Sequence, residues 1–220
     1  MADSLRVAVL ISGRGTNLQA LIDACAKNDF PAEIVRVISN NEDAFGLEIA
    51  HAAGLSTTVI DHRNFRNRTS FEKTLSVDLE QHGTELICLA GFMRLLTSSF
   101  VRHWHNRLIN IHPSLLPAFK GLNTHRRTID EGVRVAGCTV HFVRADMDAG
   151  PIIAQAAVAV LPNDDESTLA SRILAQEHVI FPLALRLIAS GQIKVINEIV
   201  QIDGELTDPD PLVSPKLNSH

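Results

Sequence analysis

Short runs of branched apolar residues alternate with amphipathic stretches through the first half of the chain, and this alternation most constrains the fold. The first run, 5–11 (LRVAVLI), stops at Ser12 and Gly13 and is typical of a strand buried on both faces. Residues 16–27 follow, with apolar side chains at helical spacing. Because strand and helix patterns keep alternating, the sequence predicts right-handed βαβ units and a doubly wound, mostly parallel α/β sheet.

The same patterns place the other elements. In the first half we expect strands at 33–39, 56–60 and 85–90 and helices at 44–53 and 65–81. In the second half we expect strands at 107–111, 136–144 and 152–160 and a long helix over about 166–189.

The second half of the chain differs from the first in how its strands are joined. An acidic turn with Gly150 and Pro151 separates the last two strands, and antiparallel pairing there would give a Rossmann-like sheet an antiparallel edge. No linker or repeat interrupts the chain. We therefore expect one domain over 1–220, in which 203–220, rich in proline and polar residues, is a poorly ordered tail.

Charge and composition exclude several classes of protein. The 220 residues carry a net charge of −5, so the basic surface of a nucleic-acid-binding protein is missing. No apolar run is long enough to span a membrane, and the N-terminus lacks the pattern of a signal peptide, which favours a cytoplasmic location. Widely spaced cysteines without a CxxC pair are typical of buried, reduced thiols rather than of disulfides or a zinc site: Cys25, Cys88 and Cys138.

A glycine-rich loop, 12–17 (SGRGTN), lies between the first strand and the first helix. The backbone N–H groups of such a loop, together with the helix N-terminus, form a ready anion site. The loop lacks the dinucleotide fingerprint, because Leu18 stands at the third glycine position and the second strand ends in Ser39-Asn40-Asn41 without an acid for a ribose. We favour a phosphate ligand over NAD; the alternative is a tight turn that needs glycine only for its geometry.

Polar residues gather where a strand of the second half ends. Asn110 and His112 are two residues apart, so in a strand their side chains point to the same side, at the edge where open α/β sheets bind ligands. An amide donor beside a protonatable imidazole suits stabilisation of an oxyanion. A carboxylate from the acidic turn would orient the imidazole, and spacing leaves Asp146 and Asp148 equally eligible. The alternatives are polar residues that cap a strand and a solvated acidic turn.

In combination, these residues resemble the folate-dependent formyltransferase family over roughly the first 195 residues. The similarity is greatest to the members that act on glycinamide ribonucleotide. It is carried by these segments: 12–20 (SGRGTNLQA), 90–94 (AGFMR), 110–117 (NIHPSLLP) with Phe119, 121–126 (GLNTHR), 148–152 (DAGPI) and 176–178 (QEH).

The resemblance implies a role for each candidate residue. As catalytic residues it assigns Asn110, His112 and Asp148, with His141 just behind them. As the ribonucleotide and phosphate site it assigns Gly13, Arg14, Gly15, Thr16, Asn17 and Glu177. As the folate site it assigns Arg68, Met93, Arg94, Leu95, Leu96, Asn110, Val143 and Met147, with backbone near 144–148 contacting the pterin.

The activity that the resemblance implies is transfer of the formyl group of 10-formyltetrahydrofolate, a co-substrate, to the amine of 5'-phosphoribosylglycinamide in de novo purine biosynthesis. No metal is expected, and the partners are small molecules, with the chain a monomer or homodimer. A formyltetrahydrofolate hydrolase is an alternative, but similar hydrolases carry an extra N-terminal domain. A methionyl-tRNA formyltransferase would need a further C-terminal domain and a basic surface. A folate- or nucleotide-binding module without catalysis would not require Asn110, His112 and Asp148 together.

Overall fold

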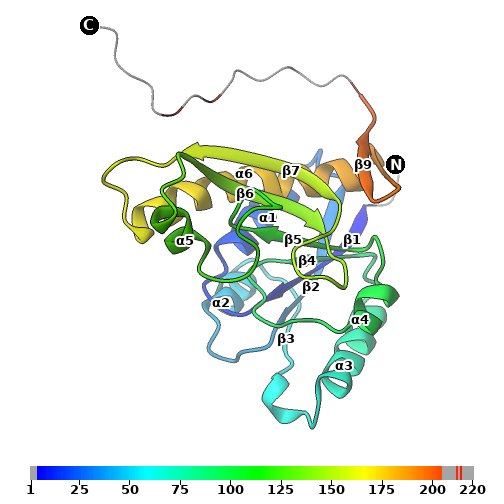
Figure 1. Ribbon diagram of the computed structural model, residues 1–220. Coiled ribbons are helices and arrows are strands. Elements are labelled where there is room, and N and C mark those ends of the chain that lie inside the picture. Colours follow the sequence, from blue (N-terminus) through cyan, green and yellow to red (C-terminus); the bar gives the residue numbers. More distant parts are fainter. Residues whose placement is uncertain (1–3, 205–211, 213, 215–220) are drawn as a thin grey trace, which may run out of the picture.

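The fold is built on a central sheet whose middle strands are buried on both faces. The computed structural model describes residues 4–204, 212 and 214, and its main sheet has seven strands in the order β3-β2-β1-β4-β5-β6-β7 (Figure 1). The strands are β1 (Leu5–Ile11), β2 (Ala32–Ser39), β3 (Thr57–Val59), β4 (Leu86–Leu89), β5 (Leu108–His112), β6 (Val135–Phe142) and β7 (Ile152–Ala159). Strands β1 to β5 are parallel, and β6 is antiparallel to both β5 and β7. The predicted doubly wound sheet with an antiparallel edge is confirmed.

Helices cover both faces of this sheet (Figure 1). One face is covered by α1 (Thr16–Cys25), α2 (Phe45–Ala52) and α6 (Glu166–Ala189), and the other by α3 (Arg68–Gln81) and α4 (Ser98–His103). Two further short helices are α5 (Thr124–Asp130), which contacts α6, and the 3-10 helix η1 (His62–Asn64).

The continuous apolar run of β1 is explained by these two layers. Val7, Val9 and Ile11 belong to the core shared with α1, α2 and α6, whereas Ala8 and Leu10 belong to the core shared with α3 and α4. All five side chains have 0 % exposure. A strand with solvent on one face would instead alternate apolar and polar residues.

The sequence patterns missed the short helices. Helices α4 and α5 have only 6 and 7 residues, too few for a helical period to emerge. The patterns also missed a separate two-stranded sheet of β8 (Ile193–Ile196) and β9 (Ile199–Ile202). Its turn residues, Asn197 and Glu198, have φ of 51° and 61°, as a two-residue hairpin requires, but they lack the Asn-Gly signature of such turns.

Two further expectations concern the ends of elements. The helix expected from residue 65 begins at Arg68, because the side chain of Asn67 accepts a hydrogen bond from the backbone N–H of Ser70 and caps it there. The expected tail, 203–220, lies almost entirely outside the described residues. Within the described part of the chain, no helix is long and apolar enough to cross a membrane.

Candidate active site

The direction in which successive strands are added to the sheet reverses between two neighbouring parallel strands, β1 and β4. From β1 the chain builds outward through β2 and β3, and it returns to the other side of β1 with β4 before continuing to β7. At such a switch point the loops after the two strands separate and leave a crevice at the carboxyl edge of the sheet. Three of the loops that leave this edge are 12–15 after β1, 90–97 after β4 and 113–123 after β5.

The glycine loop is shaped by close backbone packing. Gly15 has φ of +76°, and a Cβ at this position would lie 2.5 Å from Cα of Gly46. The N–H of Gly46 donates to the carbonyl oxygen of Gly13 over 3.0 Å, which fastens the start of α2 to the loop. Glycine at position 15 is therefore required both for its backbone conformation and for this contact.

Helix α1 begins directly after this loop. Gly15 is the N-cap and provides no side-chain hydrogen bond, so the first N–H groups of the helix are free of a side-chain cap. Two residues after the N-cap, Nδ2 of Asn17 donates to Oε2 of Glu177 over 2.7 Å, while Oδ1 of Asn17 is buried and has no partner among the described residues. Burial raises the pKa of Glu177, partly offset by the hydrogen bond from Asn17 and by the charges of His112 and Arg14.

A hollow of about 580 Å³ lies beside this helix end. It is lined by the whole glycine loop and by one face of α6, on which Ala170, Leu174 and Glu177 recur at helical spacing. The residues that sequence reasoning had not assigned to the site are Ser12, Ala90, Gly91, Ile111, Pro113, His125, Ser167, Ala170, Ser171 and Leu174. Small residues repeating along one face of the long helix were the signal that could have identified three of the four on α6: Ser167, Ala170 and Ser171.

His112 lies at the border of this hollow, since its neighbours Ile111 and Pro113 line it. The imidazole is 6 % exposed, and its Nε2 lies 3.1 Å from the carbonyl oxygen of Phe119. A carbonyl oxygen only accepts, so Nε2 carries a hydrogen. Nδ1 lies 3.5 Å from Oδ2 of Asp148. Each ring nitrogen therefore has an oxygen to which an imidazolium would donate.

Asp148 reaches His112 from the turn between β6 and β7. Its own φ is +50°, and its Oδ2 also accepts the backbone N–H of Gly121 over 2.9 Å. Further along the turn, a Cβ at Gly150 would lie 1.7 Å from the carbonyl oxygen of Phe142, so only glycine allows the turn to close. Of the two acids in the turn, Asp148 thus faces His112, whereas Asp146 is exposed.

Asn110 meets His141 across the antiparallel pair of β5 and β6. Nδ1 of His141 donates to the carbonyl oxygen of Phe142 over 2.9 Å, and burial lowers the pKa of this histidine. The neutral ring therefore presents Nε2 as an acceptor, 3.4 Å from Nδ2 of Asn110. This contact orients the amide, and its second N–H remains for another acceptor.

The residues expected at the folate site occupy two loops, one strand and one helix end. Met93, Arg94, Leu95 and Met147 are exposed, while Leu96 and Val143 pack against the core beneath α3 and α4. Arg68 is exposed at the start of α3, one turn before Glu72, whose carboxylate holds Thr97 at the far end of the 90–97 loop. Met93 also lines the hollow beside the glycine loop, and no single contact joins all of these residues, so their assignment to one site rests on the family resemblance.

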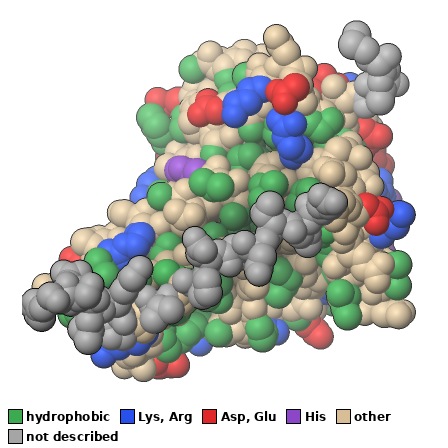
Figure 2. All heavy atoms as spheres, turned by 90° about the horizontal axis from the view of Figure 1, so that it is seen from above, with side chains coloured by type: hydrophobic (Ala, Val, Ile, Leu, Met, Phe, Trp, Pro, Cys, Tyr) green, Lys and Arg blue, Asp and Glu red, His purple; other side chains and the backbone are tan. Residues whose placement is uncertain are grey.

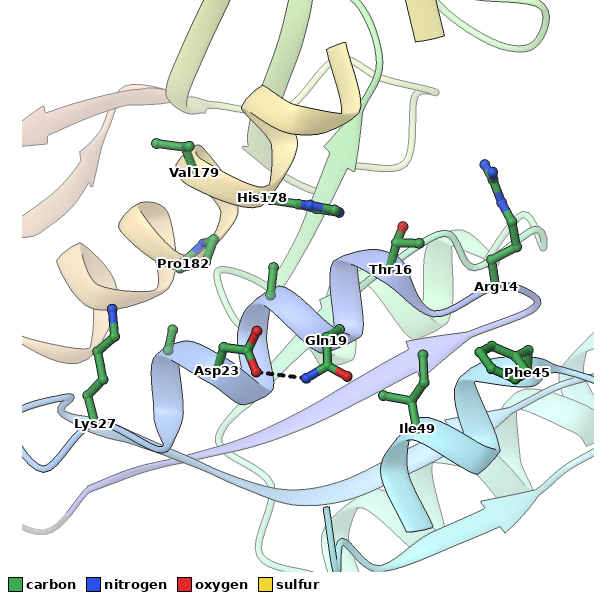
Figure 3. A pocket seen from close by; sticks show the side chains of 12 residues that line it. Arg14, Thr16, Gln19, Asp23, Lys27, Phe45, Ile49, His178, Val179 and Pro182 are labelled. Carbon is green, nitrogen blue, oxygen red and sulfur yellow. Dashed lines mark hydrogen bonds between the residues drawn. The ribbon is translucent and has the colours of Figure 1, made fainter. Parts of the chain in front are cut away.

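A second hollow, of about 780 Å³, lies on the outer side of α1 (Figure 3). It runs between α1, α2 and α6, and Arg14 and Thr16 line it as well as the smaller hollow. Its other labelled walls include Gln19, Asp23, Phe45, Ile49, His178 and Pro182. None of Asn110, His112 and Asp148 lines either hollow, but Ile111 and Pro113, which flank His112, line the smaller one, so we place the candidate site there.

On the face seen from above Figure 1, basic and acidic side chains are interspersed rather than gathered by sign (Figure 2).

The three cysteines, Cys25, Cys88 and Cys138, are free. Burial raises the pKa of Cys25 to about 11 and of Cys138 to about 12, so these two thiols are protonated near neutral pH. Among the described residues, no group of three or more His, Cys, Asp or Glu is arranged to hold a metal ion.

Comparison with known proteins gives matches that cover nearly the whole chain. The pattern of the formyl transferase family matches residues 5–185. Phosphoribosylglycinamide formyltransferase of Escherichia coli is 42% identical over 205 residues, which are 93% of this chain and 97% of that protein. The crystal structure of glycinamide ribonucleotide transformylase 1 from Symbiobacterium toebii has a TM-score of 0.90 at 47% identity, covering 93% of this chain and 96% of that one.

Some relatives are much longer. The trifunctional purine biosynthetic protein adenosine-3 of Bos taurus is 52% identical over 190 residues, and the match spans 86% of this chain but 19% of that protein. The family match and the full-length bacterial relative nevertheless agree, and they show that this chain belongs to the formyl transferase family.

Proposed function

We propose that this chain transfers the formyl group of 10-formyltetrahydrofolate to the amine of 5'-phosphoribosylglycinamide, as a one-domain cytoplasmic enzyme of de novo purine biosynthesis. The observation that carries the proposal is the contact between His112 and Asp148, with Asn110 joined to the same cluster through His141, near a helix N-terminus without a side-chain cap. The names of the full-length relatives support the same activity.

The ribonucleotide would bind with its phosphate at the glycine loop. The N–H groups at the start of α1 offer donors, and the helix dipole and the nearby charge of Arg14 favour an anion. Oδ1 of Asn17 is a buried acceptor without a donor among the described residues, and a ribose hydroxyl or the substrate amine would supply one. Glu177 is hydrogen-bonded to Asn17. Its carboxylate would accept a hydrogen bond from whichever of the two substrate groups, hydroxyl or amine, does not bind Asn17.

The folate would bind next to the ribonucleotide, since Met93 also lines the smaller hollow. Met93 and Leu95 are 67% and 61% exposed on the loop after β4, and Met147 is 53% exposed on the turn that carries Asp148. Such a display of apolar side chains around a polar centre suits a flat ring system with a polar edge. Arg68 and Arg94 are exposed and would pair with carboxylates of the folate tail.

The reaction would proceed by direct attack of the amine. The amine nitrogen forms a bond to the formyl carbon, and the formyl oxygen becomes an oxyanion that Asn110 and protonated His112 stabilise. The bond from that carbon to N10 of the folate then breaks. The amine gives up one proton and N10 receives one, with Asp148 moving it directly or through water. The products are the formylated ribonucleotide and tetrahydrofolate.

His112 would exchange one hydrogen-bond acceptor for another during this step. Its Nε2–H donates to the carbonyl oxygen of Phe119 in the structure described here. An oxyanion is the stronger acceptor, because hydrogen bonds with an ionised partner are roughly twice as strong as neutral ones. An interaction gained only in the transition state raises kcat rather than tightening substrate binding.

An absorbance assay tests the proposal. Purified protein is mixed with 10-formyl-folate with and without glycinamide ribonucleotide, and His112→Ala serves as the inactive control. We expect deformylation only when the ribonucleotide is present. Deformylation without it would establish a hydrolase, and binding of folate without turnover in either mixture would establish a binding module.

A further inference from the structure

A chain of hydrogen bonds crosses the carboxyl edge of the sheet between the loops proposed to hold the two substrates. The hydroxyl of Ser12, directly after β1, accepts the backbone N–H of Met93 over 2.8 Å. The same hydroxyl lies 2.5 Å from Oδ1 of Asn40, which follows β2. Nδ2 of Asn40 then lies 3.2 Å from Nδ1 of His62, beyond β3. Loops from four strands are thus connected through one hydroxyl and one amide.

The direction of each bond follows from the chemistry of the hydroxyl. Ser12 has a single hydrogen, and an O···O distance of 2.5 Å suits an O–H···O bond, so the hydrogen goes to Asn40. The lone pairs of Ser12 are then left for the N–H of Met93. Asn40 is 5 % exposed, so water does not readily replace these partners. A shift of the glycine loop therefore shifts the Ser12 oxygen that accepts the hydrogen bond from the Met93 backbone N–H.

The loop after β4 has a second anchor at its other end. Glu72 of α3 is 4 % exposed, and its carboxylate accepts the backbone N–H of Thr97 over 2.6 Å and also the Thr97 hydroxyl. Met93, whose side chain is exposed, is the residue anchored by Ser12, and the exposed Leu95 lies between the two anchors. Only the anchor at Ser12 belongs to the glycine loop.

We propose that Ser12 is a positioning residue that couples the two substrate sites. A phosphate held by the glycine loop fixes the Ser12 hydroxyl, which orders the Met93 backbone and with it the apolar rim of the folate site. Because such coupling is reciprocal, folate binding raises the affinity for the ribonucleotide by the same factor. This inference rests on the proposed function for the identity of the two ligands.

Calorimetric titration of tetrahydrofolate, with and without saturating glycinamide ribonucleotide, tests the coupling without turnover. In the unaltered protein we expect the ribonucleotide to lower the Kd of tetrahydrofolate by about fivefold or more. In Ser12→Ala the ratio of the two Kd values falls to unity. Ser12→Thr keeps the hydroxyl and restores the ratio. Should Ser12→Ala fail to fold, Ser12→Cys replaces the oxygen by a much weaker acceptor at nearly the same size.

Two control variants separate coupling from loosening of the loop. Glu72→Gln weakens the other anchor, so it should change the Kd of tetrahydrofolate equally with and without the ribonucleotide and keep the ratio. Ser190→Ala makes the same substitution where the hydroxyl donates to the carbonyl of Arg186 at the end of α6, and should change neither Kd. A ratio of unity in the unaltered protein, or an unchanged ratio in Ser12→Ala, would overturn the coupling. Failure of either ligand to bind the unaltered protein would instead overturn the proposed function.

Discussion

Nδ1 of His112 lies 3.5 Å from Oδ2 of Asp148, although 35 residues of chain separate them. The antiparallel pairing of β5 with β6 creates this contact, because it places His112 opposite Thr139 and returns the chain to the turn after Phe142. The backbone N–H of Gly121 holds the same carboxylate oxygen. Asp148 is thus fixed from a third segment before any ligand binds.

Asp148→Asn should abolish most of the activity. The amide keeps an oxygen for the N–H of Gly121 but no longer provides the negative charge that faces Nδ1 of His112. Loss of a positioned acid or base typically lowers kcat by about 10²–10⁴-fold. Asp146→Asn is the matched control, since this exposed acid lies in the same turn and should leave kcat unchanged. Equal losses in both variants, measured with circular dichroism to confirm folding, would argue against the assignment.

Asn110→Ala should lower kcat by about 10²–10³-fold, the typical effect of removing one oxyanion donor. KM for both substrates should change little, because the hydrogen bond is gained in the transition state. Asn28→Ala is the control, since this exposed asparagine lies in the turn after α1. A rise in KM without a fall in kcat would show that Asn110 binds substrate and does not stabilise the oxyanion.

Gly15→Ala should destabilise the fold and raise KM for the ribonucleotide more than for the folate. A positive φ alone costs a non-glycine residue about 1–2 kcal/mol. Gly132→Ala isolates that cost, since Gly132 has φ of +66° and open space around it. At Gly15 the methyl group would also displace Gly46, so urea unfolding should give the larger loss. Equal losses of stability would show that the contact with Gly46 relaxes without cost.

Glu177 should make stability depend on pH. Burial raises the pKa of its carboxyl above the ordinary value of 4.5. A raised pKa means that the folded state favours the protonated form, so this contribution is complete below pH 4.5 and is lost as pH rises through the raised pKa. Glu177→Gln should therefore gain stability relative to the unaltered protein as pH increases over this window. A constant difference in the free energy of unfolding between the two proteins would contradict the shift.

The sequence by itself determined the class of fold and most of its elements. Apolar runs such as 5–11 must be buried on both faces, and a chain that alternates them with amphipathic helices has few ways to satisfy every strand. Local rules were enough here, because periodicity and capping act within a few residues. The same rules failed for α4 and α5, which are too short to show a period.

Residue types in the motifs also named the candidates for chemistry, and resemblance to a family chose Asp148 over Asp146. Only the tertiary structure decided which side chains meet. The strand order puts β1 beside β4, so the hydroxyl of Ser12 reaches the backbone of Met93, 81 residues later. The packing of α6 over the glycine loop pairs Asn17 with Glu177. Hydrogen bonds and burial act over a few ångströms, and the distance between residues far apart in sequence is set by strand order and register, which local patterns do not contain.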